Sequence, residues 1–137
     1  MAKWLVKSEP FKWSWEEQKA KGVEPWDGVR SAQALNNMRA MKKGEEVMFY
    51  HSNKGLEIVG LCSVAREFYD DVDDPKSGLI DLKTEGDMPA PVTLKEIKAD
   101  GRFDEVALVR QSRLSVMPIP DDSWDQLMAM SKAKAAA

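Results

Sequence analysis

The sequence has little of the chemistry on which disulfides, metal centres and most catalytic sites depend. Its 137 residues include one cysteine and one histidine, which excludes a disulfide within the chain and leaves no Cys/His spacing typical of a metal site. The sequence also has no paired carboxylates and no glycine loop of the kind that cradles phosphates. We therefore expect no cofactor. Cys62 lies inside the apolar segment 58–64 and is interpreted as a buried structural thiol.

Long hydrophobic runs are absent as well. No stretch of 18 apolar residues occurs, and the first apolar residues meet Lys7 and Glu9 before a signal-type core forms. These observations predict a soluble cytoplasmic protein without a membrane partner. The length favours one domain over residues 1–137, and we expect a monomer whose tail, residues 131–137, is disordered.

The charge balance excludes a strong sequence-independent duplex binder. The formal net charge is −3, whereas proteins that hold duplex DNA by its phosphates usually carry a basic excess. Residues 1–69 contain 11 Lys or Arg and 9 Asp or Glu, and residues 70–137 contain 9 and 14. Much of the acid lies in one predicted loop, residues 70–75, so a modest local basic face remains compatible with the sequence.

The periodicity predicts an α+β fold with a strongly curved, mostly antiparallel sheet of five to six strands and short peripheral helices. Strands are expected over residues 3–8, 46–51, 57–67, 78–85 and 114–119, with the second and third forming a hairpin and Pro118 confining the last to an edge or an end. Capping boxes begin helices at Ser14 and Thr93. Ser31 caps a helix through Met38, and Asp121 or Asp122 caps a terminal helix.

Five short polar-aromatic clusters stand out along the chain, at residues 7–10, 26–30, 36–37, 50–53 and 110–113. Four of them abut an apolar run, where a strand or helix ends and a pocket collects side chains from distant segments. An aromatic plane surrounded by hydrogen-bonding groups suits a nucleobase. The candidate ligand-binding residues are Lys7, Ser8, Trp26, Arg30, Asn36, Asn37, Tyr50, His51, Ser52, Arg110, Ser112 and Arg113.

Each candidate also has a structural interpretation. Trp26, held in an extended or turn conformation behind Pro25, is expected to stack on a base, and the alternative is a core tryptophan. The other tryptophans lie within or beside regular elements and are interpreted as core or helix-staple residues: Trp4, Trp13, Trp15 and Trp124. Lys7 and Ser8 either address a base edge and a phosphate or turn the chain before Pro10. At least one of Asn36 and Asn37 is expected to tie its helix to a strand. Arg110 and Arg113 are phosphate candidates, with surface ion pairs as the alternative.

His51 raises the question of catalysis. A nucleophile with an activating base would need Ser8, Ser52 or Ser112 within hydrogen-bond reach of the imidazole, together with a third group that orients it. The sequence shows no order or spacing typical of such a triad. A binding or structural histidine is therefore favoured, and an enzyme acting on a nucleotide or nucleobase remains the alternative function.

Six ordered motifs resemble the EVE domain family over residues 4–124: residues 4–10, 26–30, 36–41, 49–53, 58–60 and 109–116. The resemblance implies a PUA-like β-pseudo-barrel, related to the YTH readers of methylated adenine in RNA and to the ASCH domains. It also implies a non-enzymatic domain that holds one extruded or unpaired modified base, a modified cytosine in DNA or a base in RNA. Ser31 and Ala32 depart from the family pattern, in which Asn is often followed by an aromatic residue.

Overall fold

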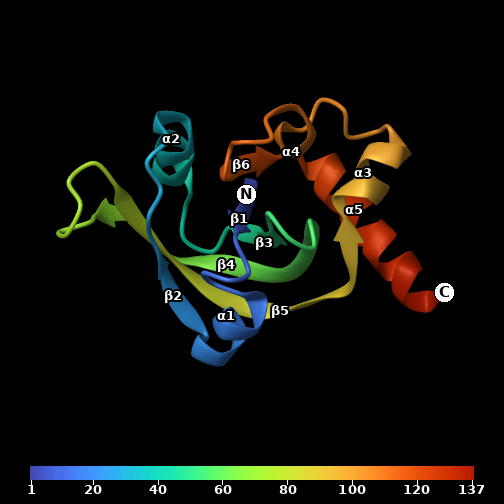
Figure 1. Cartoon of the computed structure of the whole chain (residues 1–137), viewed down its shortest axis with the longest axis horizontal. Helices are drawn as coiled ribbons and strands as arrows, with labels where there is room; N and C mark the ends of the chain where they lie inside the picture. The colour runs from blue at the N-terminus through green and yellow to red at the C-terminus, as the bar shows by residue number, and fades with distance from the viewer.

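The computed structural model describes residues 1–137 and contains one six-stranded sheet with five helices around it (Figure 1). The strands are β1 (Lys3–Ser8), β2 (Val23–Trp26), β3 (Glu46–His51), β4 (Glu57–Asp70), β5 (Gly78–Thr93) and β6 (Val116–Ile119). The helices are α1 (Trp15–Lys21), α2 (Ala32–Ala40), α3 (Leu94–Asp100), α4 (Ala107–Arg110) and α5 (Asp121–Ala136). The predicted α+β class is confirmed.

The strands lie in the order β2-β5-β4-β3-β1-β6. β1 pairs with β3 in parallel, from Lys3 opposite Glu46 to Ser8 opposite His51, and every other neighbouring pair is antiparallel. Register shifts interrupt the long β4–β5 ladder at four places, as expected for bulges that bend a sheet. The outer strands β2 and β6 do not pair with each other, so the curved sheet does not close into a barrel.

The hydrophobic core lies against this curved sheet, and its centre is aromatic. Phe49 on β3 is fully buried and contacts the rings of Trp15 and Trp26 at centroid distances of 5.1 and 5.6 Å. Trp15 lies directly on Gly60 of β4, where a Cβ atom would come within 2.2 Å of the indole. A glycine at this position therefore lets α1 approach the sheet.

Most of the expected helix and strand boundaries are confirmed. The capping boxes Ser14/Glu17 and Thr93/Glu96 both form, and Ser31 accepts from the Ala34 amide to cap α2. β6 is an edge strand, in agreement with Pro118. The structure adds two short elements that the sequence pattern does not indicate, β2 and α4. The strand β5 also continues to Thr93, and α5 begins after Pro120 without a side-chain cap from Asp121 or Asp122.

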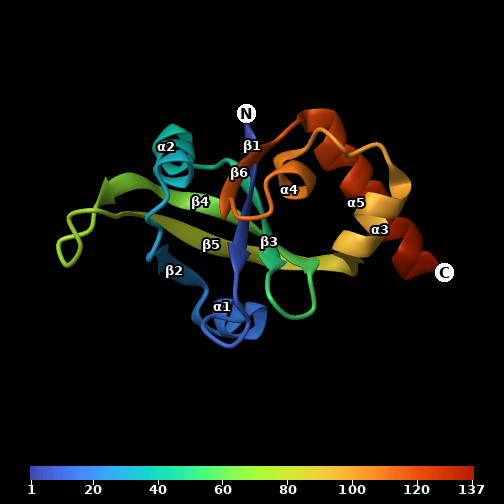
Figure 2. The same ribbon diagram turned by 45° about the horizontal axis from the view of Figure 1, so that its top comes forward.

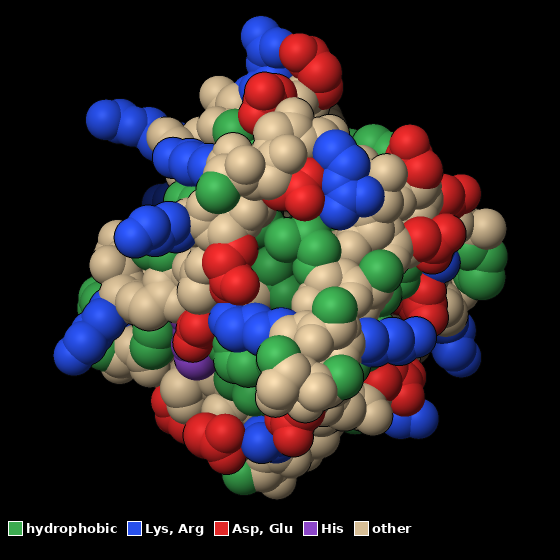
Figure 3. All heavy atoms as spheres, turned by 90° about the vertical axis from the view of Figure 1, so that its right-hand side faces the viewer, with side chains coloured by type: hydrophobic (Ala, Val, Ile, Leu, Met, Phe, Trp, Pro, Cys, Tyr) green, Lys and Arg blue, Asp and Glu red, His purple; other side chains and the backbone are tan.

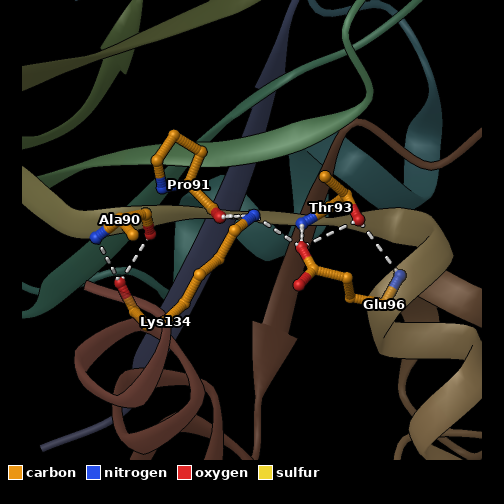
Figure 4. Close-up of polar contacts among 6 residues, drawn as sticks. Ala90, Pro91, Thr93, Glu96 and Lys134 are labelled. Carbon is orange, nitrogen blue, oxygen red and sulfur yellow. Dashed lines mark hydrogen bonds and ion pairs between the residues drawn. The ribbon is translucent and has the colours of Figure 1, made fainter. Parts of the chain in front are cut away.

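The tail is helical, in contrast to the expected disorder of residues 131–137. α5 continues to Ala136 because β5 and α3 provide partners for its last turns (Figure 4). The buried Ser131 hydroxyl donates to the Ala90 carbonyl and accepts from the Ala90 amide. Lys134 donates to the Pro91 carbonyl at 2.7 Å and to the Glu96 carboxylate at 2.8 Å. Alanine-rich composition also favours the helix, which sequence reasoning underestimated.

No helix in the structure combines the length and the apolar composition that a membrane crossing requires.

We predict that Lys134→Ala loosens the end of α5. The Lys134–Glu96 ion pair is 40% and 41% exposed, so its loss should cost only about 0.2–1 kcal/mol, measured as faster amide hydrogen exchange over residues 128–136. Lys132→Ala, on the same helix and in no ion pair, is the matched control.

Hydrogen bonds from Lys134 and Thr93 lower the pKa of Glu96 from 4.5 to about 2. The stabilisation of α5 by the Lys134–Glu96 pair should therefore be complete above pH 4.5 and lost as the pH falls toward 2. Equal amide exchange in Lys134→Ala and Lys132→Ala would contradict a role of Lys134 in holding the end of α5.

Candidate functional site

The main candidate site is a cleft of about 500 Å³ where the chain leaves β1 and where it leaves β2. Its walls come from the end of β1 and the β1–α1 connection, from β2 and the β2–α2 connection, and from Ser115 just before β6. We call it the tryptophan cleft. It is lined by Lys7, Ser8, Glu9, Lys12, Trp13, Glu24, Pro25, Trp26, Asp27, Gly28, Val29, Arg30 and Ser115. Two of the five sequence clusters, residues 7–10 and 26–30, thus meet in space.

Two indoles line this cleft and are held in different ways. Trp26 is 7% exposed and packs edge-on against Phe49, so it belongs both to the core and to the cleft wall. Trp13 is half-buried, and its Nε1–H donates to Gln18 at 2.8 Å. Gln18 is fully buried and donates in turn to the Leu82 carbonyl of β5 at 3.1 Å. The Trp13 ring is therefore fixed to the sheet through one amide group.

The polar rim of the cleft carries both signs of charge. The Lys7 ammonium donates to the Ser112 carbonyl at 2.9 Å and lies 5.8 Å from the Tyr50 ring centroid, and burial lowers the pKa of Lys7. Ser8 is 8% exposed and donates its hydroxyl to the Trp13 carbonyl. Glu9, Glu24 and Asp27 place carboxylates around the same opening. Gly28, with φ of 73°, lets the wall turn beside Trp26, in agreement with the expected tight turn.

A second hollow, of about 360 Å³, borders the tryptophan cleft. We call it the arginine hollow; its lining residues are Ser31, Gln33 and Arg110–Leu114, and only Leu114 is hydrophobic. The border is made by the Lys7–Ser112 hydrogen bond and by the step from Arg30, in the cleft, to Ser31, in the hollow. The cluster at residues 110–113 therefore lies beside the first two clusters. Arg110 pairs with Glu105 at 2.7 Å, and Arg30 pairs with Asp74 at 2.6 Å.

The remaining candidates lie outside both depressions. The Asn37 amide donates to the Val116 carbonyl at 2.7 Å, which confirms the expected tie between helix and strand. Asn36 is exposed and accepts from Arg39. Tyr50 is 2% exposed, and burial raises its pKa to about 12. Ser52 donates its backbone amide to the Ser8 carbonyl at 2.9 Å, which joins the end of β3 to the base of the cleft.

His51 lies in a separate hollow of about 370 Å³ with Trp15, Glu57 and Asp87. Its Nε2 atom accepts a hydrogen bond from the backbone amide of Trp15 at 3.0 Å, so the imidazole satisfies an amide group in the first turn of α1. Burial lowers the pKa of His51, and the Glu57 carboxylate partly opposes this effect. Its contribution to stability is thus present above pH 6.5 and lost as the pH falls through the lowered pKa.

The structure does not assemble a catalytic triad or a metal site. No hydroxyl shares a hydrogen bond with His51, and no group of three or more His, Cys, Asp or Glu side chains is arranged to hold a metal ion. Cys62 is buried as expected, and burial raises its pKa to about 12. The tryptophan cleft and the arginine hollow together bring a pair of indoles, hydrogen-bonding groups and cations close to one another.

Sequence reasoning missed Trp13 and Gln18. Trp13 lies immediately before the Ser14 cap, beside a regular element, and this position favours a core or helix-staple residue over a cleft residue. Gln18 lies on a helix whose other polar residues are more exposed, and nothing in the local pattern distinguishes it. A detectable signal was the proximity of Trp13 to the Lys7–Pro10 cluster, since a short loop keeps the two together.

Comparisons with known proteins agree with this architecture. The model of the EVE domain matches residues 2–130 of the chain. Mouse thymocyte nuclear protein 1 is 33% identical over 167 aligned residues, covering 96% of this chain and 74% of that protein.

Among solved structures, a protein from Agrobacterium tumefaciens is 46% identical with a TM-score of 0.92, covering 96% of this chain and 93% of that one. Human THYN1 in complex with 5-methylcytosine-containing DNA is 30% identical with a TM-score of 0.88, covering 96% and 98%. The YTH domain of Zygosaccharomyces rouxii MRB1, in complex with N6-methyladenosine RNA, covers 96% and 86% at 13% identity and a TM-score of 0.58, which is a likeness of fold alone.

We predict that Gln18→Met releases Trp13. The variant keeps the volume but leaves the indole N–H and the Leu82 carbonyl without their partner, which should lower the free energy of unfolding by about 1–3 kcal/mol. Urea denaturation measures this loss, and hydrogen exchange of the Trp13 indole N–H, followed by NMR, measures the release. Gln126→Met, on α5 and without side-chain hydrogen bonds, is the control. Unchanged exchange of the Trp13 indole in Gln18→Met would show that the ring is held by packing alone.

Proposed function

Because this chain belongs to the EVE domain family, we propose that it binds nucleic acid by holding one modified base in the tryptophan cleft, without transforming it. The observation that carries the proposal is the pairing of two indoles, Trp13 and Trp26, with polar groups around one opening of about 500 Å³. Such a site offers a flat apolar wall for a ring and hydrogen-bonding partners for its edges.

The size of the cleft favours a single ring system over a stretch of duplex. A base inside it must be unpaired or extruded, and extrusion costs a few kcal/mol. Stacking on an aromatic side chain returns about 1–3 kcal/mol per base. Polar contacts must supply the rest, and Ser8, Lys7 and the backbone around Gly28 lie at the appropriate rim. Unmodified duplex should therefore bind weakly.

The relatives support a modified cytosine in DNA as the ligand. The human THYN1 protein, solved with 5-methylcytosine-containing DNA, aligns with 96% of this chain. A methyl group at C5 adds apolar surface that an indole wall accommodates, and this addition is worth about 0.8 kcal/mol when buried. RNA carrying a modified base is the second ligand to be compared in the same assay.

We predict that Trp13→Ala weakens binding of a single-stranded oligonucleotide with one 5-methylcytosine by about 1–3 kcal/mol, because the variant removes one stacking face. Fluorescence anisotropy of the labelled oligonucleotide measures the affinity. Trp26→Phe keeps an aromatic wall and should bind with a smaller loss. Trp26→Ala is unsuitable, since loss of a buried tryptophan costs about 3–5 kcal/mol of folding stability.

Trp124→Phe on α5 controls for the general effect of replacing a tryptophan and should bind like the wild type. Binding by Trp13→Ala that equals the wild type, in a variant with normal urea stability, would remove the stacking role.

The proposal also predicts no turnover. Wild-type protein incubated with modified nucleosides, nucleotides and oligonucleotides should return each unchanged by mass spectrometry. His51→Gln should retain most of the binding, because glutamine accepts a hydrogen bond from the Trp15 amide but does not act as a base. Product formation that disappears in His51→Gln would replace the reader with an enzyme that uses general-base catalysis.

A further inference from the structure

The surfaces on the two sides of Arg30, at the edge of the tryptophan cleft, differ in charge. We propose that a nucleic acid strand held in the cleft leaves it over the Ser31 side of Arg30, with the phosphates next to the bound base lying in the arginine hollow, while an acidic arm on the Asp74 side of Arg30 excludes phosphate. This inference rests on the proposed function. It predicts that the ligand is a single strand or a strand end. It also predicts that Arg113, Arg110 and the acidic arm make the protein prefer such a ligand over duplex.

The arginine hollow has the position and chemistry that a phosphate next to the base requires. It shares a border with the cleft through Lys7 and Ser112, and six of its seven lining residues are polar. Lys7 and Arg113 form no ion pair in the structure. Arg110 is paired only with Glu105, whose side chain is 86% exposed. Such a surface pair is weak, so Arg110 is easily transferred to a phosphate.

The surface on the Asp74 side of Arg30 is built differently. The β4–β5 connection, residues 71–77, projects from the body beyond α2 in both ribbon views, and together with Asp70 at the end of β4 it forms the acidic arm (Figures 1 and 2). It carries four aspartates, at positions 70, 71, 73 and 74, and one lysine. Asp74 is 20% exposed and holds Arg30 at 2.6 Å. The buried Ser77 hydroxyl donates to the Val29 carbonyl at 2.7 Å, which fixes the base of the arm to the cleft wall.

A phosphate would therefore have to compete with Asp74 for Arg30. Asp74 already occupies the guanidinium with a partly buried carboxylate, and three more aspartates repel a second anion nearby. A phosphate approaching from this side meets repulsion over a Debye length of about 8–10 Å at physiological salt. A duplex is stiff and would present phosphates to the acidic arm and to the arginine hollow at once, whereas a flexible single strand can direct the phosphates on both sides of the bound base over the hollow.

The face formed by α3 and α5 carries no continuous basic surface (Figure 3). On the face formed by α3 and α5, acidic and basic side chains alternate around a hollow with a hydrophobic floor (Figure 3). Lys134, on this face, is already paired with Glu96. A continuous row of phosphates would meet both signs of charge on this face.

The test compares a free 5-methylcytosine nucleoside with single-stranded oligonucleotides of one, three and seven nucleotides that carry the same base. Arg113→Ala and Arg110→Ala should each weaken binding of the longer strands several-fold, and reduce the slope of log affinity against log salt by about 0.7. Binding of the nucleoside should not change. Lys132→Ala, which removes one exposed positive charge on α5, is the matched control and should leave all affinities unchanged.

The acidic arm is tested with Asp70→Asn/Asp73→Asn, because neither carboxylate makes a hydrogen bond or an ion pair in the structure. This variant should bind the longer strands and duplex several-fold more tightly at low salt, with no change for the nucleoside. Asp121→Asn/Asp125→Asn on α5 changes the net charge equally and should have no such effect.

The outcomes separate this inference from the proposed function. A nucleoside that fails to quench tryptophan fluorescence would overturn base binding itself. A nucleoside that binds normally, with arginine variants that keep the wild-type salt slope or an arm variant that matches its control, would overturn only the one-sided path.

Discussion

The parallel pairing of β1 with β3 is the constraint on which the rest of the structure depends. Two parallel neighbours require the chain to return from the end of the first to the start of the second. Here residues 9–45 make that return, and they form α1, β2 and α2 on the way. Both indoles of the tryptophan cleft lie on this crossover, so the site exists because the connection is long enough to wrap around the end of β1.

The same crossover explains why stability and recognition are difficult to separate. Trp26 supplies one face to Phe49 in the core and another to the cleft. Gln18 uses one amide to fix Trp13 and to satisfy a carbonyl of β5. Such shared residues hold the cleft rigid before a ligand arrives, which reduces the entropy that binding must overcome.

Local signals in the sequence predicted much of the fold. Capping boxes, strand alternation and an edge proline act within a few residues, so the helices beginning after Ser14 and Thr93 and the edge strand containing Pro118 could be placed. The tail could not, because its order depends on Ala90, Pro91 and Glu96, which are distant in the sequence. The cleft wall shows the same division: Trp26 follows Pro25, a local signal in the sequence, whereas the position of Trp13 depends on its hydrogen bond to Gln18.

β1 lies between β3 and β6, and its pairing with β6 joins Lys3 to Ile119, near opposite ends of the sequence. The N-terminal part of the chain leaves the ribosome first, so one edge of β1 stays unpaired until β6 has emerged. During that interval the exposed edge is open to pairing with other chains. Contacts between such distant segments also slow folding. The order of synthesis therefore makes the period before release of the last strands the time at which this fold is most exposed to aggregation.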